Sequence, residues 1–366
     1  MSLQPKKLKN KKEVRAGEMK LGSLFDGSGG FPLAAVMCGI TPVWASEIEP
    51  FPIKVTSKRF PNMRHIGDIT KLSGGEIEPV DIITFGSPCQ DLSISGKRAG
   101  LQGSRSSLFL EAVRIIREMR IKTDGVYPTF IIWENVYGAF SSNNGQDFQT
   151  VLEQITQIAE GPCHVPRPPI PWTVAGAVMG RRSAIAWRTF DAQFWGVPQR
   201  RRRIYLVADF RGFRAPEILF KRDNLQSDIR AFKATENNAA PNIGRGLSEA
   251  ITNKEHFIGR GAAETTRFFS RQGFGKYSEN NVSSTLMASY SSDVTDLVLT
   301  DVIRRLTPLE YCRLQGFPDW WCDGVTGSDS AQYKMWGNGV ALPCVLYIME
   351  GIAEIGTEAA NNRTEP

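Results

Sequence analysis

The sequence predicts an α/β fold with a Rossmann-like, mostly parallel sheet and a smaller irregular domain towards the C-terminus. Through the first 210 residues, short apolar runs alternate with stretches of helical periodicity. These runs are too short, and too rich in β-branched or aromatic residues, to be helices. After residue 210 the alternation stops, and Gly, Asn, Ser and Arg predominate. This order is typical of a doubly wound sheet with right-handed crossovers, followed by a separate small domain.

The strands and helices can be assigned in chain order. Buried strands are predicted at residues 21–25, 41–45, 80–85 and 129–133, with further strands at 172–179 and 204–208. Helices are predicted at residues 31–38, 50–60 and 107–120, and a terminal helix at 340–352. The segment 107–120 is the clearest helix, because its apolar residues recur at helical spacing with Arg and Glu between them.

The domain boundaries follow from this assignment. Residues 1–20 are predicted to be a basic flexible tail, and residues 21–210 a catalytic and cofactor-binding domain. Residues 211–325 form the small domain, and residues 326–366 return to the large one. The six cysteines contain no C-x-x-C pair and there are only three histidines, so we expect no metal site.

The charge distribution is more informative than the net charge of +6. Seven Lys and Arg residues against two Glu in the first twenty positions account for +5 of it. Residues 181–230 carry twelve bases and five acids, a local excess that either a polyanion groove or a solvated face would explain. No apolar run is long enough for a membrane helix or a signal peptide, so we expect a cytoplasmic protein. We also expect it to be a monomer.

The residues that follow each predicted strand are where a ligand would bind in an open parallel sheet. The first strand leads into Phe25-Asp26-Gly27-Ser28-Gly29-Gly30, which lacks the third glycine of a dinucleotide fingerprint. Glu47 ends the second strand and Asp68 the third unit, where carboxylates can accept ribose hydroxyls. This pattern favours a nucleoside without a pyrophosphate, such as S-adenosylmethionine, although structural turns with capping acids explain it nearly as well.

Chemically reactive residues follow the later strands. The fourth strand runs into Gly86-Ser87-Pro88-Cys89-Gln90, and the next ends in Trp133-Glu134-Asn135-Val136. Gln199-Arg200-Arg201-Arg202-Arg203 leads into the strand at 204–208, so alternation puts Arg201 and Arg203 on one face. A thiol, a carboxyl group and two guanidinium groups should therefore converge at one edge of the sheet.

These motifs resemble those of the DNA (cytosine-5) methyltransferases of bacterial or phage type. The resemblance continues through Arg305 to Glu310, Arg313, Gln315, Phe317 and Pro318, and closes with Gly337-Asn338. It runs from about residue 20 to about residue 350 in the family's order. One departure is Gly339, where family members often have Ser or Ala. The resemblance implies a class I S-adenosylmethionine-dependent methyltransferase fold.

The resemblance also implies a role for each site residue. Cys89 would be the nucleophile, Glu134 would bind the N3 and amine edge of cytosine, and Arg203 would contact O2, with Arg201 near the thiolate and phosphate. The cofactor set would be Phe25, Gly27, Gly29, Gly30, Glu47, Ile48, Asp68, Ile69, Pro88, Leu108, Asn338 and Val340. The DNA-binding set would be Ser93, Ser95, Arg105 and Gln199, with no metal ion.

The expected substrate is cytosine in a specific sequence of double-stranded DNA. The target base is hidden in the duplex and must be flipped out, and residues 91–107 fit a flap that closes over it. The family places target recognition between the arginine motif and Arg305, about residues 211–300. A cognate restriction endonuclease is an expected partner. The alternatives are a transfer RNA cytosine-5 methyltransferase and a noncatalytic DNA-binding relative.

Overall fold

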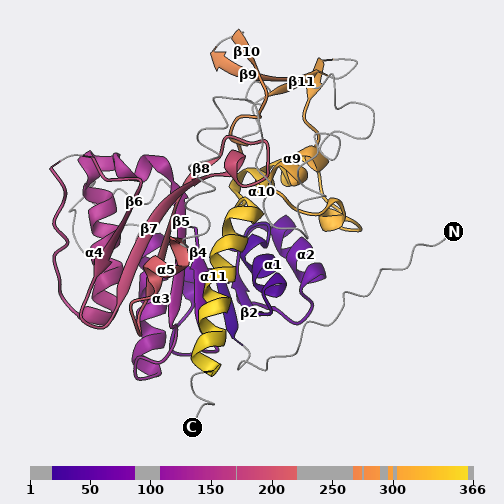
Figure 1. Cartoon of the computed structure of the whole chain (residues 1–366). Coiled ribbons are helices and arrows are strands. Elements are labelled where there is room, and N and C mark those ends of the chain that lie inside the picture. The colour runs from indigo at the N-terminus through magenta and orange to yellow at the C-terminus, as the bar shows by residue number, and fades with distance from the viewer. Residues whose placement is uncertain are drawn as a thin grey trace, which may run out of the picture.

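The computed structural model describes residues 19–86, 108–169, 171–220, 267–273, 276–288, 296–299 and 303–361. Its body is one eight-stranded sheet with helices on both faces, as Figure 1 shows. The strand order is β3-β2-β1-β4-β5-β8-β7-β6. The strands are β1 (Lys20–Leu24), β2 (Thr41–Ser46), β3 (Arg64–His65), β4 (Ile82–Phe85), β5 (Phe130–Val136), β6 (Ala175–Met179), β7 (Ala184–Asp191) and β8 (Arg202–Asp209).

The five strands from β3 to β5 run parallel, whereas β8, β7 and β6 each run antiparallel to the neighbour before them. The predicted fold class is confirmed, with a mixed sheet whose parallel part carries the first four predicted strands. The parallel strands end at the same edge, which is the upper one in Figure 1. Ligand chemistry is expected at that edge.

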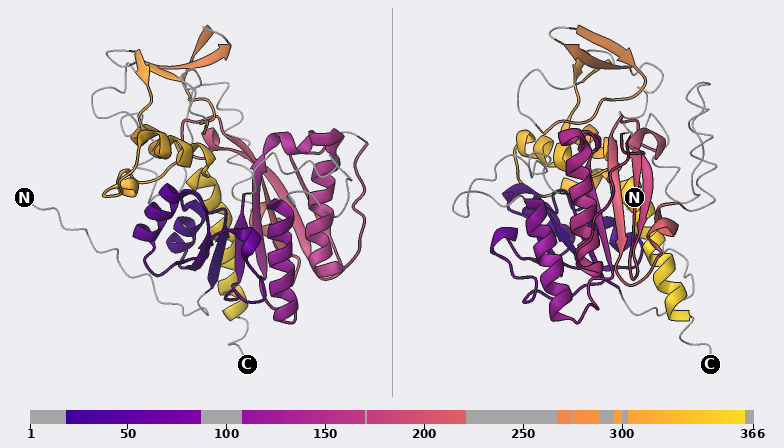
Figure 2. Two further views of the ribbon diagram at one scale, coloured as in Figure 1. Left: turned by 180° about the vertical axis from the view of Figure 1, so that it is seen from behind. Right: turned by 90° about the vertical axis from the view of Figure 1, so that its left-hand side faces the viewer.

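Helices cover both faces of the sheet (Figure 2). One face packs against α1 (Gly30–Met37), α2 (Pro50–Arg59), α5 (Ala215–Leu219) and α11 (Leu342–Asn361), and the other against α3 (Leu108–Lys122) and α4 (Gln146–Glu160). Each face has its own apolar core, so the sheet is buried on both sides, as parallel sheets usually are. The early helix predictions agree with α1, α2 and α3 to within two residues at most ends.

The sequence analysis missed β7 and α4. In β7 the run Ala184-Ile185-Ala186-Trp187-Arg188 mixes good helix formers with a charged residue, which hides the strand. Arg188 is nevertheless buried, because its guanidinium donates to the carbonyl of Leu219 at 2.8 Å and lies over the ring of Phe190. A tertiary contact therefore decided the structure of this segment against its local propensity.

A second, smaller sheet lies above the first (Figure 1), with the order β10-β9-β11-β12. Its strands are β9 (Arg267–Gly273), β10 (Lys276–Asn280), β11 (Leu297–Leu299) and β12 (Ile303–Arg305). It is followed by α9 (Pro308–Leu314), the 3-10 turn η6 (Asp319–Cys322) and α10 (Asp329–Asn338). The small region is thus partly an antiparallel sheet, not irregular throughout. At the other predicted boundary, α5 packs on β7, β8 and α11, so the large body extends past residue 210.

The basic segment 181–230 does not form one patch within the described residues. Strands β7 and β8 are antiparallel, and their register pairs Ala184 with Asp209 and Asp191 with Arg202. Residues just before β7 and just after β8, including Arg181 and Arg211, therefore lie at the end of the sheet opposite to Arg202. Strand reversal divides the described part of this block between two ends of the sheet, so these arginines do not line one continuous groove.

Among the described residues, no single helix is both long and apolar enough to cross a membrane. Helices α10 and α11 meet both conditions only when taken together as a pair, and this pair is bent by 46°. Apolar side chains of both helices are buried in the core of the protein.

Candidate active site

A cavity of about 590 Å³ opens at the carboxyl ends of the parallel strands. Most of the predicted site residues that the structure describes line it. They are Phe25, Gly27, Glu47, Ile48, Asp68, Ile69, Leu108, Glu134, Arg201, Arg203 and Asn338. Pro88, Cys89, Ser93, Ser95 and Arg105 lie outside the described residues. The edge of the sheet thus brings together residues predicted to bind the cofactor and residues predicted to bind the base.

The glycine turn after β1 shapes the floor of this cavity. Phe25 and Gly27 have φ values of +55° and +56°, a left-handed backbone that glycine tolerates best. Gly30 and Val340, both predicted to bind cofactor, pack against each other instead of lining the cavity, since a Cβ on Gly30 would lie 2.5 Å from Val340. Gly29 is likewise a packing residue, because a Cβ there would lie 2.7 Å from Thr56.

Glu47 organises the loop that faces this turn. One carboxylate oxygen accepts the amide of Gly27 at 2.8 Å, and the other accepts the amides of Ile48 and Glu49 at 2.8 and 2.9 Å. These bonds fix the carboxylate at the end of β2 while leaving it lone pairs for a ligand. Ile48 is 66% exposed, so a large apolar side chain lies open on the cavity wall.

Asp68 caps a short turn on the same side of the cavity. Its carboxylate accepts the backbone amide and the hydroxyl of Thr70 at 3.0 and 2.8 Å. These hydrogen bonds hold the pKa of Asp68 below its ordinary value, so the group stays ionised. Two carboxylates and an exposed apolar side chain are therefore grouped at one end of the cavity.

Asp26 lies beneath the glycine turn and is not among the predicted site residues. It is buried, and neither of its carboxylate oxygens has a hydrogen-bond partner among the described residues. Burial raises its pKa from 3.8 to about 7, and repulsion by Glu47 adds to the rise. The Ser23 hydroxyl offsets part of the rise without meeting hydrogen-bonding geometry.

Glu134 and Arg203 form an ion pair at the other end of the cavity. Glu134 stands on β5 and Arg203 on β8, which pair in antiparallel register. The guanidinium Nε lies 3.3 Å from Glu134 Oε1, and both side chains are largely buried. Arg203 also donates to the carbonyl of Arg202 at 2.9 Å. The strand pairing thus presets a carboxylate and a guanidinium side by side.

Arg201 joins this end of the cavity to the C-terminal segment. Its side chain is buried, and Nη2 donates to the carbonyls of Gly337 and Gly339 at 3.2 and 2.5 Å. Burial lowers its pKa to about 10, helped by repulsion from Arg203, so the group remains a cation at neutral pH. Its Nε and Nη1 have no hydrogen-bond partner among the described residues.

Gln199, predicted to bind DNA, is fully buried. Its amide nitrogen donates to the carbonyl of Leu314 at 2.8 Å, and its amide oxygen accepts from the amide of Leu286 at 3.3 Å. The side chain thus ties β8 to α9 and to the segment leading from the small sheet. No face of it is open to a nucleic acid in this structure.

The comparison with known families accounts for this arrangement. A family model described as C-5 cytosine-specific DNA methylase matches residues 19–354. The chain belongs to the C-5 cytosine-specific DNA methylase family. The predicted membership is therefore confirmed.

Relatives of this methylase fall into two groups by length. A protein of Escherichia phage P1 named DNA N-6-adenine-methyltransferase is 31% identical over 318 residues, covering 77% of this chain but only 41% of the phage protein. The type II methyltransferase M.HhaI of Haemophilus parahaemolyticus is 26% identical, covering 93% of this chain and 96% of the relative. M1.ScrFI of Lactococcus lactis is 28% identical, covering 93% and 79%.

Solved structures share the fold of this methylase. Dnmt2 of S. pombe superposes with a TM-score of 0.60 at 14% identity, covering 95% of this chain and all of the other. A putative DNA modification methyltransferase from an E. coli prophage gives 0.53 at 17% identity, covering 92% and 99%. At these identities the likeness supports the fold class alone.

Several lining residues of the methylase cavity could not be found from sequence. Lys334 and Met335 reach it from α10, about 130 residues after the arginine motif, and Lys334 forms an ion pair of 2.8 Å with Glu49. Only Gly337-Asn338 at the end of α10 carried a signal in the sequence.

Gly339 shows why this methylase departs from the family at that position. Its φ of −70° suits any residue, so backbone strain does not require glycine. A Cβ there would instead lie 2.6 Å from the Ser28 hydroxyl, which is buried and has no hydrogen-bond partner among the described residues. Ser28 in the glycine turn thus occupies the space that a side chain at 339 would need.

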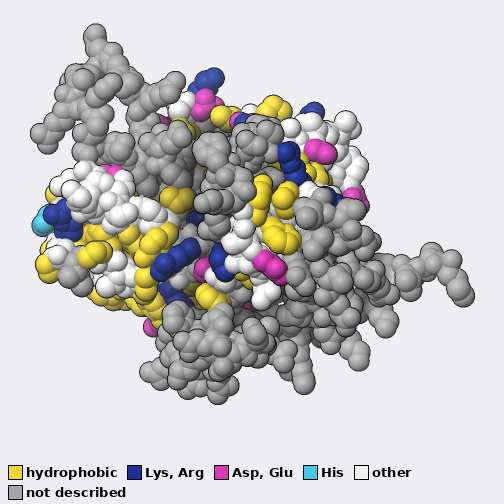
Figure 3. Space-filling model, turned by 90° about the horizontal axis from the view of Figure 1, so that it is seen from above, with side chains coloured by type: hydrophobic (Ala, Val, Ile, Leu, Met, Phe, Trp, Pro, Cys, Tyr) yellow, Lys and Arg dark blue, Asp and Glu magenta, His cyan; other side chains and the backbone are white. Residues whose placement is uncertain are grey.

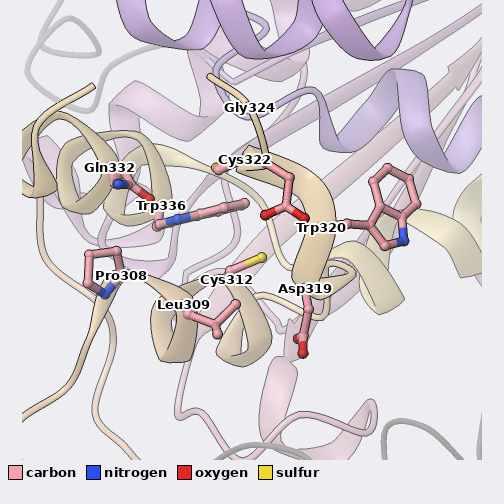
Figure 4. A pocket seen from close by; sticks show the side chains of 10 residues that line it. Pro308, Leu309, Cys312, Asp319, Trp320, Cys322, Gly324, Gln332 and Trp336 are labelled. Carbon is pink, nitrogen blue, oxygen red and sulfur yellow. The ribbon is translucent and has the colours of Figure 1, made fainter. Parts of the chain in front are cut away.

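A second cavity, of about 510 Å³, is lined by residues of α9, η6 and α10 (Figure 4). Cys312, Trp320, Cys322 and Trp336 contribute to its walls, and none of the predicted site residues lines it. Trp336 and Gln332 face this cavity, whereas Lys334 and Met335 on the same helix face the first one. No group of three or more His, Cys, Asp or Glu side chains in the described part of the chain is arranged to hold a metal ion.

Proposed function

We propose that the protein transfers a methyl group from S-adenosylmethionine to C5 of a flipped-out cytosine in a specific sequence of double-stranded DNA, through a covalent bond between Cys89 and C6. The observation that carries this proposal is that one cavity, the one of about 590 Å³, holds both groups of residues. It joins a pair of carboxylates suited to a nucleoside with an ion pair suited to a pyrimidine edge.

The cofactor end of the cavity fits S-adenosylmethionine. Glu47 and Asp68 would accept hydrogen bonds from the ribose and adenine, and Ile48 would pack on the adenine ring. The cavity volume lies within the range of about 300–1,000 Å³ usual for small-molecule sites. Bound there, S-adenosylmethionine would supply the sulfonium methyl group that ends on C5 of the base.

The base end of the cavity would hold the cytosine ring. Glu134 accepts a hydrogen bond from the exocyclic amine and shares one with N3, while Arg203 donates to O2. The 3.3 Å contact between the two side chains orders both before the base arrives, so less side-chain entropy is lost on binding. Arg201 adds positive charge beside them, which favours a thiolate in this region.

Cys89 would activate the carbon that accepts the methyl group. Its thiolate adds to C6, forming a sulfur–carbon bond and moving an electron pair onto C5. Once C5 has been methylated, it loses its proton and the bond to Cys89 breaks, which restores the C5=C6 double bond. Ser93, Ser95 and Arg105 are assigned to the DNA-contacting flap by family resemblance, since residues 87–107 lie outside the described ones.

Two further assignments go with this function. The relatives named type II methyltransferases suggest a cognate restriction endonuclease as a partner in the same system. A DNA substrate would place the enzyme at the nucleoid, acting as a monomer.

The decisive experiment offers the purified protein DNA that contains 5-fluorocytosine, together with S-adenosylmethionine. The fluorine cannot leave as a proton, so a covalent protein–DNA complex should accumulate and Cys89 should carry the adduct by peptide mass spectrometry. Cys89→Ala should abolish both trapping and methyl transfer while still binding DNA. Transfer to tRNA but not to duplex DNA would refute the proposal, as would turnover by Cys89→Ala. Bisulfite sequencing of DNA from cells that express the protein would give the target sequence.

A further inference from the structure

Four consecutive arginines precede and enter β8, and they divide into two pairs. Arg201 and Arg203 line the cavity, where one bonds the carbonyls of Gly337 and Gly339 and the other pairs with Glu134. Arg200 and Arg202 are both exposed and line neither cavity. The proposed chemistry uses the first pair and leaves the second without a role.

Arg202 is held in place by an aromatic ring. Its guanidinium carbon lies 3.8 Å from the centroid of Tyr137, which opens the turn η3 (Tyr137–Phe140) directly after β5. The Tyr137 ring packs edge-to-face on Phe140, with centroids 5.4 Å apart, so the platform is itself supported. A guanidinium stacked in this way keeps its edge N–H groups available in a fixed plane.

Arg200 lies just before β8 and is held by contacts with Asn280 and Ser283. Its backbone amide donates to the carbonyl of Ser283 at 2.8 Å, and its Nη2 donates to Asn280 Oδ1 at 3.2 Å. The amide oxygen carries no net charge. Arg200 therefore connects the start of β8 to the small sheet. This contact does not neutralise its positive charge.

Neither exposed arginine forms an ion pair with a described carboxylate, unlike several other arginines of the protein. Arg214, for example, pairs with Asp209 at 3.1 Å, and Arg313 pairs with Asp319 at 2.7 Å. Figure 3, which looks down on the end of the sheet that carries the cavity, shows basic side chains near the middle of this face. Uncompensated, preorganised guanidinium groups beside a base-binding cavity are what phosphate oxygens select.

We propose that Arg200 and Arg202 bind backbone phosphates that flank the flipped nucleotide, with Tyr137 as the support for Arg202. The inference rests on the proposed DNA substrate and extends it to named contacts. Phosphate contacts of this kind set the position of the duplex without reading its sequence. The arginine motif thus has two roles. Arg201 and Arg203 act at the base, whereas Arg200 and Arg202 bind the backbone of the strand that carries it.

The test is the salt dependence of DNA binding, measured by fluorescence anisotropy with a short duplex of mixed sequence and no cofactor. Arg202→Ala should weaken binding about fivefold and reduce the slope of log K against log salt by about 0.9. Arg200→Ala should do the same, and the double variant should lose about 1.8 from the slope. Tyr137→Phe should keep the slope and affinity, whereas Tyr137→Ala should weaken binding while keeping most of the slope.

Arg211→Ala is the matched control, because Arg211 is also exposed but lies at the opposite end of the sheet. Its slope should equal that of the wild type. Equal slopes for Arg202→Ala and wild type, or equal losses for Arg202→Ala and Arg211→Ala, would overturn the proposal. The readout needs no methyl transfer, so a wild-type protein that binds DNA but does not methylate it would count against the proposed function alone. A slope change seen with tRNA but not with duplex DNA would also overturn the inference.

Discussion

The two ends of the main sheet treat their buried polar groups in opposite ways. At the end away from the cavity, Asp209 is fully buried and accepts hydrogen bonds from the amides of Arg211 and Arg214 and from the guanidinium of Arg214. At the cavity end, Asp26 and two guanidinium nitrogens of Arg201 are buried with no hydrogen-bond partner among the described residues.

Buried polar groups without partners cost stability, so they are rare unless something else requires them. One end of the sheet is built for stability and the other is left open for binding. Among the unsatisfied buried groups, those of Glu134 and Arg201 line the cavity, and those of Asp26 and Ser28 lie in the glycine turn beside it.

The largest effect should come from Glu134 at the cavity end of β5. Glu134→Gln keeps the shape of the side chain but removes its charge, so it should lower kcat by about 10²–10⁴-fold. Methyl transfer to duplex DNA, measured at saturating cofactor and substrate, checks this. Asp209→Asn, on the strand paired with β5 but at the far end, should retain kcat in the folded protein. A loss below tenfold for Glu134→Gln would contradict the assignment.

Asp26 should make stability fall as pH rises. Its pKa is about 7 in the folded protein and 3.8 unfolded, so the unfolded state releases the proton first. Between about pH 4 and pH 7 folding therefore becomes less favourable, by up to about 4 kcal/mol in total. Asp26→Asn should remove this penalty, which urea unfolding at pH 5 and pH 8 would measure. The variant should gain most over wild type at pH 8.

Asp209→Asn supplies the contrast in the same experiment. It weakens the contact with Arg214 and should destabilise the protein at pH 8 by about 2–3 kcal/mol. The two substitutions are chemically identical, so opposite signs at pH 8 would establish the difference between the ends. A destabilised Asp26→Asn would mean that the buried carboxylate has a partner which stabilises its charge.

The smallest effect concerns the contact between Ser28 and Gly339. Gly339→Ala should cost about 1–3 kcal/mol in thermal unfolding and raise the KM for S-adenosylmethionine, because its Cβ would meet the Ser28 hydroxyl at 2.6 Å. Adding Ser28→Ala removes the oxygen and should restore most of the loss. Additive effects in this double-mutant cycle would show that the two positions are not coupled.

The residues at the sheet edge could be predicted from sequence because they directly follow the predicted strands. Residues that follow parallel strands share one edge, so Glu47, Asp68 and Glu134 could be grouped before any coordinates existed. Side-chain alternation also put Arg201 and Arg203 on one face, and both line the cavity. Periodicity and position within a strand were enough for these residues.

Contacts between distant segments could not be predicted in the same way. Arg201 bonds carbonyls more than 130 residues away, and nothing in either segment encodes that meeting. The amide side chain of Gln199 could hydrogen-bond to DNA, yet it is buried against residues of the small region. The basic segment is continuous only along the chain. The reversal between β7 and β8 places its described arginines at opposite ends of the sheet.

The burial of Gln199 has a consequence for how such proteins can be recombined. The segment at residues 283–286 lies across the entry to β8 through hydrogen bonds at Pro198, Gln199 and Arg200. A segment grafted in place of this strip would have to supply equivalent hydrogen bonds, or the arginines that line the cavity would lose their anchor. Chimeras whose junction lies before residue 283 keep the chain's own strip and should keep a working cavity, whereas a graft that runs past residue 286 must supply an equivalent one.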